Sequence, residues 1–65
     1  MTTYILQREF TIEMWEKTYN VRIYKVYEKF ANVPSYECYI DNVPSIRRWS
    51  RIAKRDVENY IYRYL

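Results

Sequence analysis

The sequence predicts a small α+β protein in which a three-stranded antiparallel sheet is covered on one face by a C-terminal amphipathic helix (βββα). Apolar side chains in residues 45–65 recur at the three- and four-residue spacing of a helix face. Residues 6–14 and 36–40 alternate apolar and polar side chains, as half-buried strands do. The segment Asn-Val-Pro-Ser, at residues 32–35 and 42–45, breaks the chain twice. The 65 residues are expected to form one domain, residues 1–65.

The first predicted strand is residues 6–14. Its apolar side is expected to consist of Leu6, Phe10, Ile12 and Met14, with Arg8 as the one polar misfit, lying across the edge of the core. Residues 16–18 are the expected turn. Because this turn lacks the Asn-Gly or Asp-Gly of a tight hairpin, we expect a loop longer than two residues.

Residues 19–30 admit two interpretations. As a strand, Tyr19, Val21 and Ile23 share a face, and a bulge near Tyr24-Lys25 would explain the slip in alternation that follows. As a helix, a different set aligns on one side: Tyr19, Ile23, Val26, Tyr27 and Phe30. The high content of Tyr, Val and Ile favours the strand.

The third strand and the helix complete the predicted core. Tyr36, Cys38 and Ile40 alternate on the inward side of residues 36–40. The helix of residues 45–65 is expected to begin with Ser45 as its N-cap. Its inward face would consist of Ile46, Trp49, Ala53, Val57, Tyr60, Ile61 and Tyr64.

The net charge of +3 is unevenly distributed along the chain. Residues 1–44 carry five basic and six acidic side chains, whereas residues 45–65 carry six basic and two acidic ones. The basic side chains expected on the outer face of the helix are Arg47, Arg48, Arg51, Lys54 and Arg55. Tyr39 and Tyr62 are expected to face outward as well, and exposed Tyr beside Arg is typical of protein interfaces.

The composition argues against most enzyme classes. Without histidine the chain has no imidazole for acid–base work, and without glycine it has no phosphate-cradling loop. The single cysteine, Cys38, is expected to be a small core residue. We therefore expect a non-enzymatic protein with neither a cofactor nor a bound metal. The lone cysteine and the lack of a signal peptide or long apolar run favour a cytoplasmic location without membrane contact.

Two functions remain open. The first is a small accessory protein, similar in kind to those encoded by phages and mobile elements, that modulates or inhibits a larger partner. The basic face and the surface tyrosines would bind an acidic protein surface or a nucleoprotein complex, and the many aromatic residues would also suit a homodimer. The second function is direct binding of duplex DNA or RNA by the arginine-rich face.

A limited resemblance bears on the second function. A three-stranded sheet backed by a C-terminal helix looks like the arm-binding domain of tyrosine recombinases and the last four elements of the double-stranded-RNA-binding domain. The segment Arg47-Arg48-Trp49-Ser50-Arg51 resembles the basic cluster at the helix start of the latter domain. The resemblance implies duplex contacts by these basic side chains.

Overall fold

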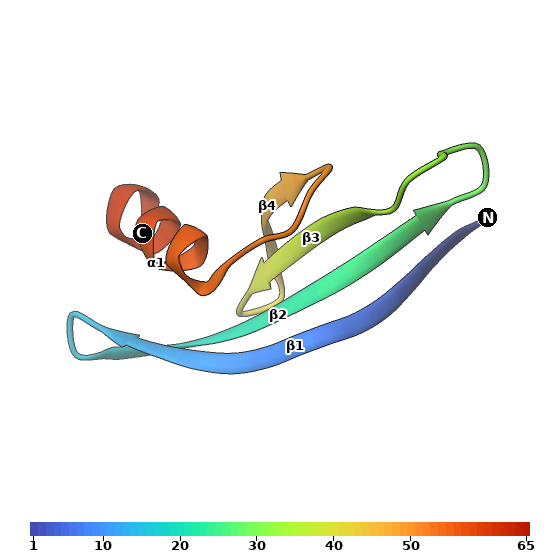
Figure 1. Cartoon of the computed structure of the whole chain (residues 1–65). Coiled ribbons are helices and arrows are strands. Elements are labelled where there is room, and N and C mark those ends of the chain that lie inside the picture. Colours follow the sequence, from blue (N-terminus) through green and yellow to red (C-terminus); the bar gives the residue numbers. More distant parts are fainter.

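The computed structural model describes all 65 residues as one antiparallel sheet with a single helix packed on it (Figure 1). The elements in chain order are β1 (Thr2–Met14), β2 (Lys17–Glu28), β3 (Ser35–Ile40), β4 (Val43–Arg48) and α1 (Lys54–Tyr64). The strands lie in the sheet in the same order. The predicted α+β class with one C-terminal helix is confirmed, but the prediction of three strands is wrong, because the sheet has four.

β1 and β2 form a long hairpin with a two-residue turn. Met14 pairs with Lys17, and both turn residues, Trp15 and Glu16, have positive φ, at 54° and 61°. Positive φ at both central residues matches the right-handed twist of the flanking strands. The expected longer loop at residues 16–18 is therefore wrong. The strand interpretation of residues 19–30 is confirmed as far as Glu28, and the helix is excluded.

The irregularity in this hairpin lies in β1 rather than β2. Leu6 pairs with Tyr24 and Arg8 with Ile23, which leaves Gln7 as an extra residue. β2 pairs with β3 without interruption through residues 21–26, so the expected bulge near Tyr24-Lys25 is wrong. Because side chains alternate along a strand, the extra residue sends Leu6 to the opposite face from Phe10.

The segment expected to start the helix forms the fourth strand instead. Asp41 and Asn42 have φ of 50° and 67° and make a second two-residue turn, after which Val43 pairs with Ile40. Asp and Asn tolerate this backbone better than most residues do. Ser45 is therefore not a helix N-cap.

The helix starts eight residues later than predicted. Ala53 is its N-cap, and the Asp56 carboxylate accepts a hydrogen bond of 2.8 Å from the Ala53 N–H. A carboxylate in the first turn also suits the positive end of the helix dipole. With 11 residues, α1 is neither long nor apolar enough to cross a membrane.

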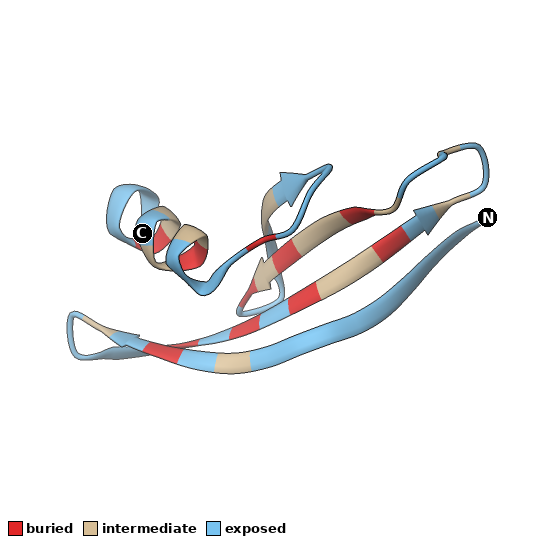
Figure 2. Ribbon diagram, in the orientation of Figure 1, coloured by how far each residue is buried: buried red, intermediate tan, exposed pale blue.

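The core lies between α1 and one face of the sheet (Figure 2). Its buried side chains are Ile12, Tyr19, Val21, Ile23, Cys38, Ile40, Ile52, Val57 and Ile61. Ile46 and Tyr60 pack against this cluster, as predicted. Trp49, Ala53 and Tyr64, also predicted to be core residues, are exposed. Trp49 follows the end of β4, where it is 67% exposed.

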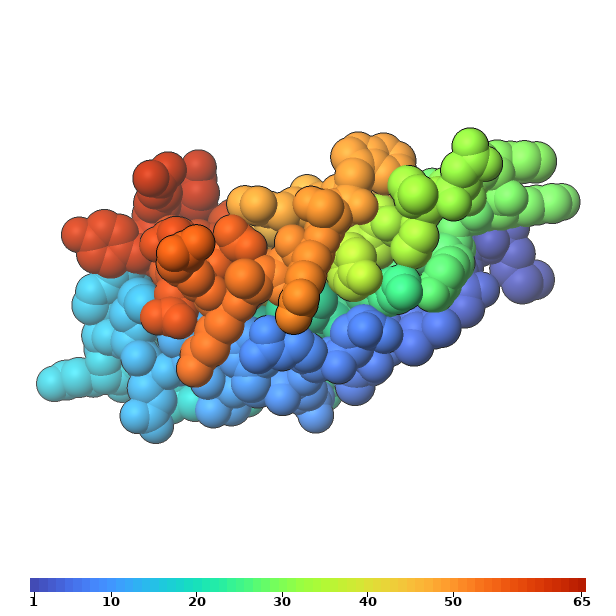
Figure 3. All heavy atoms as spheres, viewed as in Figure 1, coloured from blue at the N-terminus to red at the C-terminus, as the bar shows by residue number.

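α1 covers only part of the sheet. The molecule measures 41 × 16 × 15 Å, and α1 lies at the end that carries the β1–β2 turn (Figures 1 and 3). At this end Tyr62 stacks on Trp15, with ring centroids 5.9 Å apart. At the other end, residues 1–9 are all exposed. β1 thus extends well beyond the part of the sheet that the helix covers.

The contrast between Ile61 and Trp49 gives a stability test. Ile61 is fully buried, so Ile61→Ala should lower the free energy of unfolding by about 2–5 kcal/mol. Trp49→Ala at the exposed site should change it by less than about 1 kcal/mol. Urea unfolding followed by circular dichroism measures both, and a larger loss for Trp49→Ala would contradict this packing.

Candidate binding surface

The sheet face opposite α1 carries a row of three tyrosines, one from each of the first three strands. Tyr4 in β1 meets Tyr24 in β2 edge to face, with ring centroids 6.2 Å apart and an interplanar angle of 85°. Tyr24 meets Tyr39 in β3 in the same way, at 5.4 Å and 85°. Edge-to-face contact is a favoured arrangement of aromatic rings. We call this row the tyrosine row.

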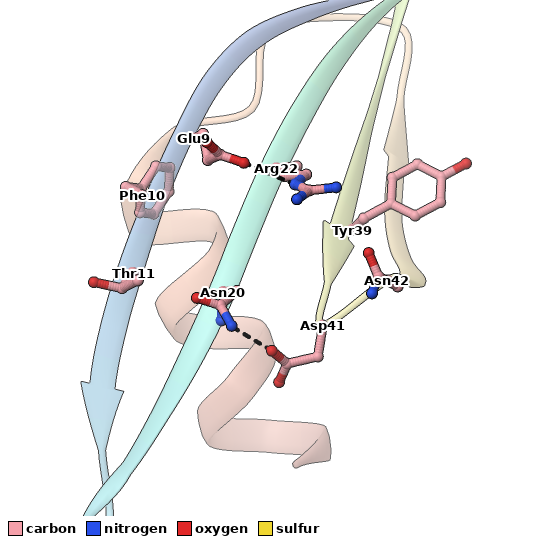
Figure 4. Close-up of a pocket in the computed structure, with 8 residues that line it drawn as sticks. All are labelled: Glu9, Phe10, Thr11, Asn20, Arg22, Tyr39, Asp41 and Asn42. Carbon is pink, nitrogen blue, oxygen red and sulfur yellow. Dashed lines mark hydrogen bonds and ion pairs between the residues drawn. The ribbon is translucent and has the colours of Figure 1, made fainter.

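The strand register and the bulge place these rings on one face. Tyr24 alternates with the inward-facing Ile23, and Arg22, on the same face as Tyr24, pairs with Tyr39. Tyr4 reaches this face because the extra residue at position 7 shifts the alternation of β1. In Figure 4, Arg22 and Tyr39 project from the sheet toward the viewer while α1 lies behind it.

A buried valine, Val26, lies beside the tyrosine row. Val26, between Tyr4 and Ser35 in the register, is fully buried although it belongs to the face opposite α1. It lies outside the main core cluster. On this face Val26 is the cross-strand neighbour of Tyr4.

The basic side chains Arg22 and Arg47 on this face form ion pairs with acidic ones. Arg22 Nε donates to Glu9 Oε2 at 2.8 Å, and Arg47 Nη2 donates to Glu28 Oε1 at 2.9 Å. The hydrogen bond to Glu9 raises the pKa of Arg22, with a further contribution from Tyr24. The face consequently presents no unbalanced positive charge to a phosphate backbone.

Tyr39 has a carboxylate partner of its own. Its hydroxyl donates to Glu37 Oε1 at 3.2 Å. Removal from water and then the nearby Glu37 charge raise the pKa of Tyr39, because both disfavour the phenolate. The hydroxyl therefore stays protonated at neutral pH and can serve as a hydrogen-bond donor.

A shallow hollow borders the tyrosine row (Figure 4). It is lined by Glu9, Phe10, Thr11, Asn20, Arg22, Tyr39, Asp41 and Asn42. Its floor is fixed by two hydrogen bonds: Asn20 N–H donates to Asp41 Oδ1 at 3.0 Å, and Asp41 N–H donates to Asn20 O at 2.8 Å. Such a polar hollow beside the half-buried ring of Tyr39 suits a partner side chain.

The predicted basic stripe is divided among three segments. Arg47 and Arg48 belong to β4, where Arg47 is paired with Glu28 and Arg48 with Asp56 at 3.4 Å. Arg51 lies in the connector between β4 and α1, and Lys54 and Arg55 form the first turn of α1. The resemblance to a basic cluster at a helix start therefore fails for Arg47 and Arg48.

Three of the five predicted basic side chains have no carboxylate partner. Arg51, Lys54 and Arg55 are exposed and form no ion pair within 4.0 Å. The Lys54 ammonium instead lies 5.9 Å from the centroid of the Phe10 ring. We call these three residues the basic group.

The two predicted tyrosines belong to different surfaces. Tyr62, on α1, is 71% exposed and stacks on Trp15. Tyr39 lies on the opposite side of the sheet, so the structure does not bring it together with the residues of α1. Tyr4 and Tyr24 were not predicted as site residues. The edge-to-face contacts that unite them with Tyr39 depend on the strand register.

Cys38 is a core residue, as predicted, and pairs with Ile23 and Ile46 in the sheet. Burial raises the pKa of its thiol from the usual 9.0 to about 11, because the thiolate is disfavoured away from water. A thiol of this kind is a poor nucleophile at neutral pH. No group of three or more His, Cys, Asp and Glu side chains is arranged to hold a metal ion.

Comparison of the chain with protein-family models, with curated proteins and with solved structures gave no match.

The Cys38 environment predicts slow thiol labelling. At pH 8 a thiol of pKa about 11 has about 100-fold less thiolate than one of pKa 9.0. Iodoacetamide should therefore label the native protein at least about 100-fold more slowly than the urea-unfolded chain. The native rate should still be rising with pH above 9. A native rate equal to that of the unfolded chain would show that the thiol is not buried.

Proposed function

We propose that this chain is a non-enzymatic protein that binds a larger protein and modulates or inhibits it, with the tyrosine row as its main contact surface. The observation that supports this most is the position of the row. Three tyrosines, linked by two ring contacts through Tyr24, lie on the sheet face opposite α1.

Tyrosine is suited to this role because it buries a large area and also offers a hydroxyl. Aromatic residues are enriched in the centres of protein interfaces, where a few of them supply most of the binding free energy. Contacts between neighbouring rings reduce the conformational entropy lost on binding. The ion pair of Arg22 with Glu9 and the negative charge of Glu37 favour a protein over a nucleic acid here.

The basic group provides a second contact of opposite character. Arg51, Lys54 and Arg55 have no carboxylate partner within the chain, so they are free to pair with acidic side chains of a partner. We infer that the partner has an acidic surface, as a protein of the nucleic-acid machinery that mimics a phosphate backbone would. The small size fits an accessory inhibitor of the phage or mobile-element kind.

Substitutions in the tyrosine row should weaken partner binding. A tagged Tyr24→Ala/Tyr39→Ala variant should capture its partner from lysate with an affinity lower by about 30-fold or more, the range of interface hot spots. Tyr27→Ala is the matched control, since Tyr27 is an exposed tyrosine of the same strand whose side chain points to the other face.

The captured protein should be identified by mass spectrometry and its affinity for each purified variant measured by calorimetry. Equal affinities of the wild type and the double variant would refute the role of the tyrosine row. Equal losses for Tyr27→Ala and the double variant would refute it as well.

The unpaired basic group also favours a second candidate function, direct binding of duplex DNA or RNA. Three cations within five residues could neutralise several phosphates. The ion pairs of Arg47 and Arg48 reduce the charge available for such contacts.

A salt series with a mixed-sequence duplex tests this candidate. If it holds, binding at low salt should collapse by about 0.2 M salt, and Arg51→Glu/Arg55→Glu should abolish it. Lys17→Glu/Lys29→Glu, which makes the same change in net charge outside the basic group, should leave most of the binding. No duplex binding at low salt would exclude the candidate.

A further inference from the structure

The free edge of β1 is the longest unpaired stretch of backbone in the sheet. β1 has 13 residues and pairs with β2 on one side only. Its first half, residues 2–7, carries no charged side chain, and Tyr4, Ile5 and Leu6 are 49%, 45% and 47% exposed. A long apolar edge of this kind readily pairs with another strand.

The register shows which residues present their backbone groups at this edge. Asn20 of β2 directs its N–H and its carbonyl oxygen toward Asp41, on the β3 side. By alternation, the odd-numbered residues of β2 direct theirs toward β1. Lys25 and Tyr27 pair with Ile5 and Thr3, so Thr2, Tyr4 and Leu6 present their N–H and C=O groups to solvent.

We propose that β1 pairs antiparallel with β1 of a second copy of this chain, with Tyr4 opposite Tyr4 at a two-fold axis. In this register Thr2 meets Leu6 of the second copy, and Thr3 meets Ile5. The three outward-facing residues of each copy would then exchange about six hydrogen bonds, which is every unpaired backbone group of residues 2–6 that faces the edge.

Charge restricts the pairing to this half of β1. A two-fold axis at Thr11 would place Glu9 opposite Glu13 of the second copy, and like charges directly opposite one another destabilise a sheet. The register centred on Tyr4 opposes no like charges. Strand sequence and charge therefore fit a second copy of the chain paired through this half of β1.

The pairing closes at two copies. The other edge of the sheet, β4, has only six residues and includes Pro44, which has no N–H to donate. A two-fold axis uses the same edge of both chains, so no free β1 edge remains. In the combined sheet the tyrosine rows of both copies would lie on the same face, and the two Tyr4 side chains would be neighbours at the axis. The pairing does not depend on the proposed function.

Native mass spectrometry of the full chain over a concentration series tests the proposal. The wild type should form a dimer. Tyr4→Lys, which places like charges opposite each other at the axis, should weaken the dimer by about tenfold or more. Thr11→Lys is the matched control, since Thr11 is an exposed residue of the same strand outside the paired half, and it should dimerise like the wild type.

A mixture of variants tests the register itself. Tyr4→Lys and Tyr4→Glu should each dimerise about tenfold or more weakly than the wild type when alone. When mixed they should form a one-to-one heterodimer preferentially, since opposite charges then meet at the axis. Thermal unfolding of each variant checks that it is folded. A wild type that remains monomeric up to millimolar concentration would overturn the proposal, and so would a mixture that forms no heterodimer. Dimers of wild-type strength in Tyr4→Lys would also overturn it.

Discussion

The packing of α1 onto the sheet is the interaction on which the rest of the structure depends. The only buried side chains outside the strands are Ile52, just before α1, and Val57 and Ile61 within it. A helix rises less than half as far per residue as a strand does, and α1 also has fewer residues than β1. The helix is therefore less than half as long as the strand. One short helix closes one end of one face and leaves the remainder open.

The open regions are where the chain can meet other molecules. The extra residue at position 7 turns Tyr4 to the face opposite α1, where it joins Tyr24 and Tyr39. The same part of β1 has an unpaired edge without charge. Balanced ion pairs on the tyrosine face and unpaired cations near the start of α1 make the two surfaces chemically different. A protein partner could contact both only by reaching around the molecule.

Elements with strong periodicity can be predicted from the sequence. The strand β4 cannot, because it depends on the two-residue turn at Asp41 and Asn42. The spacing of Val57 and Ile61 correctly predicts the helix, and the composition of residues 19–28 correctly predicts a strand. The spacing of Ile46, Trp49 and Ala53 matches a helix face, although Ile46 belongs to β4 and the other two residues lie in the connector that follows it. The Trp15-Glu16 turn has no sequence signal. The outward direction of Tyr39 follows from alternation in its strand. The direction of Tyr4 depends on the extra residue in β1, whereas alternation predicted the bulge in β2.

Partial coverage of the sheet by α1 can be measured directly through the isoleucine methyl groups. In dilute solution, a soluble gadolinium chelate should strongly broaden the NMR signals of Ile5, which is 45% exposed. It should leave those of Ile23 and Ile61, each at most 2% exposed, nearly unchanged. Equal protection of Ile5 and Ile23 would contradict an open β1, and broadening of Ile61 would contradict the packing of α1 on the sheet.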